Sequence, residues 1–124
     1  MSTFLGHQTT VDFYGCKSEK ISSCKFIEDT LLKAAKLLNL TVVNTTIHSF
    51  SPIGVSGVIV IKESHIAIHT WPEHNYIAID FFTCNKSFNL NFGLEWLKQE
   101  FKAENLSVKE IKRGDLKEIA DYKF

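Results

Sequence analysis

The fold is decided by the stretch Lys62-Glu63-Ser64-His65-Ile66-Ala67-Ile68-His69-Thr70-Trp71-Pro72-Glu73. Alternation with a period of two predicts a strand from His65 to Trp71, with the two histidines on one face and the two isoleucines on the other. Short turn signals flank this strand on both sides. Such connections suit antiparallel hairpins, because a parallel crossover needs a dozen or more residues. The stretch therefore predicts the middle of an antiparallel sheet.

Neighbouring segments extend this sheet. β-branched and aromatic residues predict strands over 41–50, 55–61 and 76–84, with weaker strands at 13–14 and 107–111. Apolar residues three and four positions apart predict one helix over 24–40 and a second that starts between 87 and 91 and ends near 101. The expected fold class is α+β, a two-layer sandwich with two helices on one face of an antiparallel sheet.

The strand expected over 76–84 carries large apolar side chains on both faces. Tyr76 and Phe82 share one face, whereas Ile77, Ile79 and Phe81 share the other. Two helices cover only one face of a sheet, so the other face needs a partner. We expect a second copy of the chain to pack sheet against sheet, which gives an αββα dimer.

Composition limits the classes of function. The chain has 124 residues, of which 44% are hydrophobic, and this suits one domain over 1–124. Fourteen basic and fourteen acidic residues give no net charge, which does not favour nucleic acid or an anionic membrane as a partner. No apolar run approaches the roughly 20 residues of a membrane span, and the first residues do not resemble a signal peptide. We expect a cytoplasmic protein whose three cysteines are free thiols.

Candidate reactive groups gather around the opening stretch. Ser64 follows an acidic residue at a strand edge, although an isolated serine there usually only bonds nearby backbone. His65 and His69 share a face, but four strand residues span roughly 13 Å, which is too far for one metal ion. We therefore expect no metal site. A structural role and acid–base chemistry both remain open for the histidines.

Hairpin register brings a thiol toward this serine. If His69 pairs with about Ala78, Cys84 lies close to Ser64, and a hydroxyl, an imidazole and a thiol are expected to converge at one site. The alternative is that Cys84 is a small hydrophobic strand residue. Upstream, Ser56 lies between glycines and runs into a strand, a context that excludes the strand–turn–helix elbow of an esterase.

Three segments together resemble the short prokaryotic S-adenosylmethionine decarboxylases. They are Phe50-Ser51-Pro52-Ile53-Gly54-Val55-Ser56-Gly57-Val58-Ile59-Val60-Ile61-Lys62-Glu63-Ser64-His65, Ile68-His69-Thr70-Trp71-Pro72-Glu73-His74 and Ile79-Asp80-Phe81-Phe82-Thr83-Cys84. The resemblance extends more loosely from Phe13 through the first predicted helix. Several motifs in the same order make a chance match improbable.

The resemblance implies a proenzyme that cleaves itself between Glu63 and Ser64. The products would be a beta chain, 1–63, and an alpha chain, 64–124, whose first residue becomes a pyruvoyl cofactor. That ketone forms a Schiff base with the substrate amine and stabilises the carbanion left by carbon dioxide. By the same resemblance, His69 is the proton acceptor for processing, Ser56 assists it, and Cys84 is the proton donor for catalysis.

The resemblance also implies a substrate and a partner. S-adenosylmethionine would be decarboxylated for spermidine biosynthesis, with Phe50 as an aromatic face for the adenine or sulfonium, Glu73 on the ribose hydroxyls and Ile66 lining the pocket through its backbone. The family builds this site where two cleaved protomers of a homodimer meet.

Two features depart from the family pattern. Leu5-Gly6-His7-Gln8 has no arginine where related sequences often read Gly-Arg-His, and Asn85-Lys86 follows Cys84 where a glycine is common. These departures leave two alternatives open. The chain could decarboxylate another amino acid, such as ornithine or arginine, or it could be a non-catalytic regulatory homologue.

Overall fold

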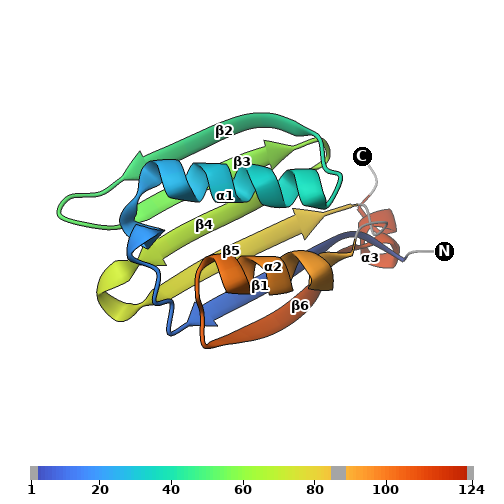
Figure 1. The fold of residues 1–124 in the computed structure, drawn as a ribbon. Helices are drawn as coiled ribbons and strands as arrows, with labels where there is room; N and C mark the ends of the chain where they lie inside the picture. The colour runs from blue at the N-terminus through green and yellow to red at the C-terminus, as the bar shows by residue number, and fades with distance from the viewer. Residues whose placement is uncertain (1–2, 85–88, 123–124) are drawn as a thin grey trace.

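The computed structural model describes residues 3–84 and 89–122. Six antiparallel strands form one sheet in the order β2-β3-β4-β5-β1-β6 (Figure 1). The strands are β1 (Phe4–Tyr14), β2 (Val42–Ser49), β3 (Val55–Ile61), β4 (Ser64–Trp71), β5 (Tyr76–Thr83) and β6 (Asn105–Asp115). Central β4 holds Ser64, Ile66 and His69, and Cys84 directly follows β5, so the sheet is the frame of the site.

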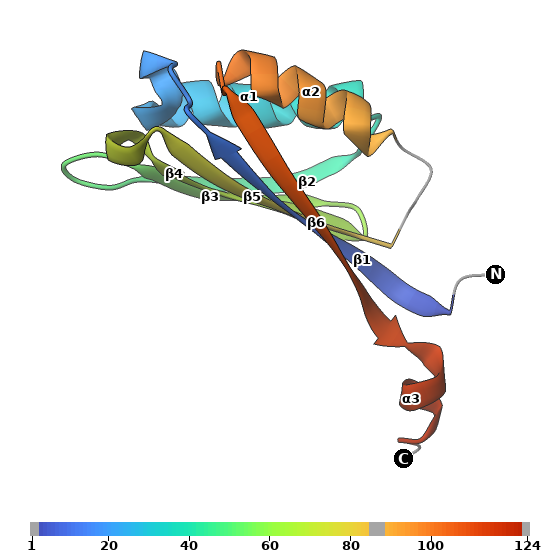
Figure 2. The same cartoon turned by 90° about the horizontal axis from the view of Figure 1, so that it is seen from below.

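Two main helices, α1 (Cys24–Leu37) and α2 (Leu90–Glu100), cover one face of the sheet (Figure 2). Each begins at a side-chain cap that satisfies a free backbone N–H: Ser23 accepts from the Phe26 amide, and Asn89 accepts from the Phe92 amide. A short helix, α3 (Leu116–Ala120), follows β6, and two 3₁₀ turns span Glu19–Ser22 and Pro72–His74.

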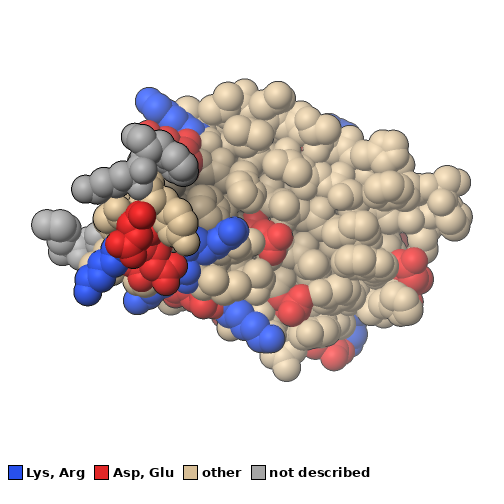
Figure 3. Space-filling view, turned by 180° about the vertical axis from the view of Figure 1, so that it is seen from behind, with Lys and Arg blue, Asp and Glu red and all other residues tan. Residues whose placement is uncertain are grey.

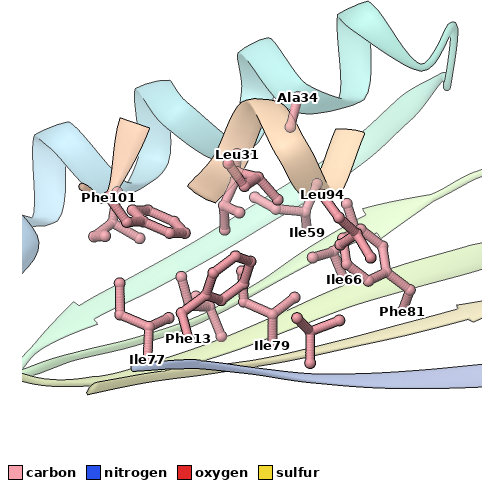
Figure 4. Packing of buried hydrophobic residues seen from close by; sticks show 14 of the residues in the cluster. Phe13, Leu31, Ala34, Ile59, Ile66, Ile77, Ile79, Phe81, Leu94 and Phe101 are labelled. Atoms are coloured by element: carbon pink, nitrogen blue, oxygen red, sulfur yellow. The ribbon is translucent and has the colours of Figure 1, made fainter. Parts of the chain in front are cut away.

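The core lies between these helices and the sheet (Figure 4). Phe13 on β1 and Phe101 at the end of α2 are fully buried and meet edge to face, with ring centroids 5.3 Å apart. Side chains at every second strand position point into this core, which is the alternation that the sequence shows. The core fixes which face of each strand remains outside.

Neither α1 nor α2 covers the other face of the sheet, and the short α3 lies on that side only beyond the end of β6 (Figure 2). Figure 3 shows this face, where Lys, Arg, Asp and Glu are sparse except toward the side on which α3 lies. Its exposed apolar side chains include Val58 and Val60 of β3 and Tyr14 of β1. We call this surface the open face.

The structure confirms the α+β sandwich and corrects several boundaries. The strand expected at 13–14 begins at Phe4, β6 extends beyond 107–111 at both ends, and α3 was not expected. The first helix ends at Leu37 rather than at Leu40. Positions 85–88, which include Asn85, Lys86 and part of the expected start of the second helix, lie outside the described residues.

Candidate active site

Ser64 is the first residue of β4 and follows a two-residue turn, Lys62-Glu63, that joins it to β3. Glu63 has a φ of 66°, in the left-handed region that residues with a Cβ rarely adopt. The Ser64 side chain is only partly buried. The serine hydroxyl and the preceding carbonyl therefore lie at an accessible and locally strained turn.

Ser64 pairs with Thr83 of β5, and its Oγ donates a hydrogen bond to Thr83 Oγ1 at 3.1 Å. Cys84 follows immediately and is exposed. His69 pairs with Ala78 in the same hairpin, so the expected register is confirmed. Ile66, two positions after Ser64, is buried and lines a small cavity of about 10 Å³ together with Ser64 and Thr83.

His69 lies on the open face, directly opposite Ser56 of β3. Its ring stacks on Trp71, with centroids 3.9 Å apart, and faces Phe50 at 5.9 Å with an angle of 15° between the planes. Phe50 keeps 46% of its surface exposed. An imidazole with an aromatic neighbour on each side is held in one orientation, which suits a group that must transfer a proton.

Two hollows flank this imidazole. One, of about 210 Å³, is lined by Phe50, His69 and Glu73, the last from the 3₁₀ turn Pro72–His74. The other, of about 230 Å³, is lined by Ser56, His69 and Asp80 among others. The residues expected to bind the substrate through an aromatic face and a carboxylate therefore lie together, on the open face.

Farther along the open face, the Tyr76 hydroxyl donates a hydrogen bond to Asp12. Burial, together with this hydrogen bond, raises the pKa of Tyr76 well above its ordinary value. The phenol therefore stays protonated at neutral pH and extends the aromatic row that begins at Phe50 and passes through Trp71.

The candidate residues form two groups within one chain. Ser64 and Ile66 point toward the helices, whereas Ser56 and His69 point to the open face. His69 is five positions along β4 from Ser64, a span of about 16 Å. The expectation that hydroxyl, imidazole and thiol converge is therefore wrong for a single chain, although Ser64 and Cys84 do lie at the same end of the sheet.

The structure adds His7, which was not among the candidate residues. His7 of β1 pairs directly with Thr83, only 7% of it is exposed, and neither ring nitrogen has a hydrogen-bond partner. Sequence patterns hide this position because the buried face of early β1 carries polar His7 and Thr9 in place of large apolar residues. Within 3–84 and 89–122, no three His, Cys, Asp or Glu side chains are grouped as a metal ion requires. In the same ranges, no helix is long and apolar enough to cross a membrane.

Comparison with known proteins places this geometry in a family. A family model described as S-adenosylmethionine decarboxylase matches residues 7–114. The chain belongs to the S-adenosylmethionine decarboxylase family. The resemblance drawn from residues 50–84 is thereby confirmed, and with it the expected enzyme class, because members of this family are decarboxylases and hence lyases.

Relatives of this decarboxylase family cover nearly the whole chain. S-adenosylmethionine decarboxylase proenzymes are 46% identical in Acidithiobacillus ferrooxidans, over 90% of this chain and 84% of the relative, and 44% identical in Thermotoga maritima, over 93% and 88%. The crystal structure of the adenosylmethionine decarboxylase from Aquifex aeolicus matches with a TM-score of 0.82 and 29% identity, over 91% of this chain and 93% of that one. Both fold and family are therefore shared along most of the length.

Proposed function

We propose that this chain cleaves itself between Glu63 and Ser64. The product decarboxylates S-adenosylmethionine and so supplies the aminopropyl donor for spermidine biosynthesis. The observation that carries the proposal is the position of Ser64, at the start of a strand after left-handed Glu63, with its hydroxyl hydrogen-bonded and Cys84 beside its strand partner. Family membership supplies the substrate, and the names of the relatives supply the word proenzyme.

Cleavage requires Ser64 Oγ to attack the Glu63 carbonyl carbon, which converts the peptide bond into an ester. A base then removes the α-proton of residue 64, and the ester leaves as the carboxylate of Glu63. The dehydroalanine that remains at position 64 tautomerises to an imine, which water hydrolyses to the ketone with loss of ammonia. His69 is the base that we assign to this second step, and Ser56, its partner across β3 and β4, would hold the developing oxyanion.

The residues present fit a pyruvoyl group at position 64, because a serine at an accessible turn can be converted without removing any core side chain. Such a group would supply a ketone that binds the substrate amine and accepts electrons as carbon dioxide leaves. Cys84, exposed and one residue beyond the partner of Ser64, would deliver a proton to the substrate carbon. Phe50 and Glu73 would hold the nucleoside in the hollow beside His69.

A homodimer that forms from uncut chains and persists as cleaved protomers resolves the separation of the two groups. Ser64 and Cys84 of one copy need Ser56 and His69, yet about 16 Å of strand divides them within a chain. Because Ser64 is the first residue of β4 and adjoins the Lys62-Glu63 turn, a second copy that packs its open face against the first can bring its own His69 to this end of the sheet, beside the Glu63–Ser64 bond. We therefore propose a site shared between two copies, in a cytoplasmic enzyme.

Intact-mass analysis after incubation tests the cleavage. The wild-type chain is expected to yield fragments 1–63 and 64–124, the second with a blocked N-terminus, whereas Ser64→Ala stays whole. The same preparation is assayed for carbon dioxide release from S-adenosylmethionine, ornithine and arginine. A chain that remains whole would contradict self-processing, and faster release from ornithine or arginine would contradict the substrate.

Mixed dimers test the shared site. Ser64→Ala and His69→Ala chains, each with a different tag, are produced together and apart. If His69 acts on the neighbouring copy, the His69→Ala chain is cut when its partner is Ser64→Ala and stays whole by itself. A His69→Ala chain that stays whole in both samples would show that His69 acts within its own chain.

A further inference from the structure

A row of polar side chains crosses one end of the sheet on its helix side, and the proposed function uses only part of it. Ser64, Thr83 and His7 are consecutive partners across β4, β5 and β1, and all three point toward the helix side. The next row along these strands continues with Ile66 and Phe81, which are buried apolar residues. Buried polar groups in proteins almost always have a hydrogen-bond partner, so a group in this row that lacks one calls for an explanation.

His7 has no hydrogen-bond partner in the described structure. Its side chain is 8% exposed, and both Nδ1 and Nε2 lack a hydrogen bond. Nδ1 lies 3.6 Å from the Glu110 carboxylate of β6, close enough for attraction once the ring is protonated. Lys112, also of β6, pairs with His7 and holds its ammonium group over the ring of Phe4. His7 is therefore a base that has a carboxylate on one side and Thr83 on the other.

One step of self-cleavage has no assigned proton acceptor. His69 is assigned to the α-proton, but the Ser64 hydroxyl must lose its own proton when it attacks the Glu63 carbonyl. That hydroxyl donates to Thr83 Oγ1, and Thr83 is the strand partner of His7, although no hydrogen bond joins Thr83 to the His7 ring. A nucleophile, a second hydroxyl, a base and a carboxylate 3.6 Å from that base therefore follow one another across four strands.

We propose, building on the proposed self-cleavage, that His7 is a positioning residue that takes up the Ser64 proton through the Thr83 hydroxyl. As Ser64 Oγ bonds to the Glu63 carbonyl carbon, its proton moves to Thr83 Oγ1 while the Thr83 proton moves to His7, and the carbonyl electron pair moves to oxygen. The oxyanion then re-forms the C=O bond as the C–N bond breaks, the electron pair of the C–N bond stays on the nitrogen of residue 64, and the proton held by His7 passes to that nitrogen to give a free amine. The Glu110 carboxylate stabilises the transient imidazolium.

Trapping the ester separates the role of His7 from that of His69. Hydroxylamine cuts an ester but spares a peptide bond, so it reveals chains that have completed the first step. His69→Ala is expected to accumulate a chain that hydroxylamine cuts at residue 63. His7→Gln is expected to stay whole with or without hydroxylamine and to process at least about a hundredfold more slowly than wild type. His7→Gln that cuts at the wild-type rate, or that accumulates ester, would overturn the proposal.

Variants at Thr83 and Thr9 guard against a merely structural effect. Thr83→Val removes the intermediate hydroxyl and should block cleavage, whereas Thr83→Ser, which keeps it, should cleave faster than Thr83→Val. Thr9→Val changes the neighbouring buried hydroxyl on β1 and should process normally. If Thr83→Val processes like wild type, the relay is excluded even where His7→Gln is poorly folded. A wild-type chain that never cuts would instead reject the proposed function itself.

Rescue by small added bases tests proton transfer directly, because a loss of packing alone would not make the cleavage rate depend on the basicity of the added compound. In His7→Ala, added imidazole should restore cleavage, whereas pyrazole, which has nearly the same shape but is a far weaker base, should not. Equal rescue by both compounds, or rescue by neither in a variant whose far-ultraviolet circular dichroism matches wild type, would count against proton transfer to His7.

Discussion

Glu63 precedes the bond that we expect to break, and its φ of 66° carries a testable cost. Left-handed backbone costs a residue with a Cβ on the order of 1 kcal/mol and costs glycine little. In a Ser64→Ala background, where the chain stays whole, Glu63→Gly is expected to raise the free energy of unfolding by about 1 kcal/mol, as measured by urea denaturation. Lys62→Gly is the matched control and should lower it. Equal losses in both variants would show that Glu63 stores no strain.

The thiols differ in accessibility, and this predicts selective labelling. Burial raises the pKa of Cys16 to about 11, and the residue is fully buried, whereas Cys84 is exposed. Because the thiolate is the reactive form, iodoacetamide at pH 8 should label Cys84 and leave Cys16 unmodified until the pH approaches 11. Peptide mapping by mass spectrometry measures both sites. Early labelling of Cys16 would contradict its burial.

Replacement of Cys84 should separate self-cleavage from catalytic turnover. Cys84→Ala should still cut itself, because the thiol has no part in ester formation or in loss of the α-proton. Carbon dioxide release should then fall by about a hundredfold or more, the usual contribution of a positioned proton donor. Intact mass and a carbon dioxide assay on one preparation measure both effects. Full turnover without Cys84 would remove it from the protonation role.

At the scale of the elements, Phe13 joins the sheet to α2. It is fully buried and packs edge to face on Phe101. Phe13→Ala should lower the free energy of unfolding by about 3 to 5 kcal/mol, because it leaves a cavity where β1 meets the helix. Phe92→Ala, on the exposed side of α2, is the matched control and should change it by less than about 0.5 kcal/mol. Urea denaturation of both variants checks the difference.

The sequence predicted β2 to β5 well and β1 and β6 poorly, for a physical reason. Strands β2 to β5 carry β-branched and aromatic residues in alternation, and short turns set the register that pairs His69 with Ala78. The first half of β1 buries His7 and Thr9, and β6 is largely exposed, so neither shows apolar alternation. The sequence predicts only the end of β1, at 13–14, and His7 lies in the part of the strand that it does not predict.

At the scale of the whole molecule, the sequence could identify the site residues but not how they assemble. Alternation over 65–71 places His69 on the face opposite Ile66, and the structure places Ser64 on the Ile66 face. Convergence inferred from hairpin pairing alone takes no account of these faces. In the proposed function, the open face of another copy supplies part of the site, and the family resemblance, not the alternation, predicts that arrangement.

Disruption of the open face should separate assembly from folding. Val58 of β3 lies on that face and is 40% exposed, so Val58→Asp places a charge in the proposed contact without disturbing the core. We expect light scattering to show about twice the 14.1 kDa chain mass for wild type and a single chain for Val58→Asp. Because His69 would then have no neighbouring Ser64, Val58→Asp should also fail to cut itself while its thermal unfolding stays cooperative. Leu37→Asp, on the exposed side of α1, should remain dimeric and cut normally. A monomeric Val58→Asp that cuts at the wild-type rate would show that one chain completes its own site.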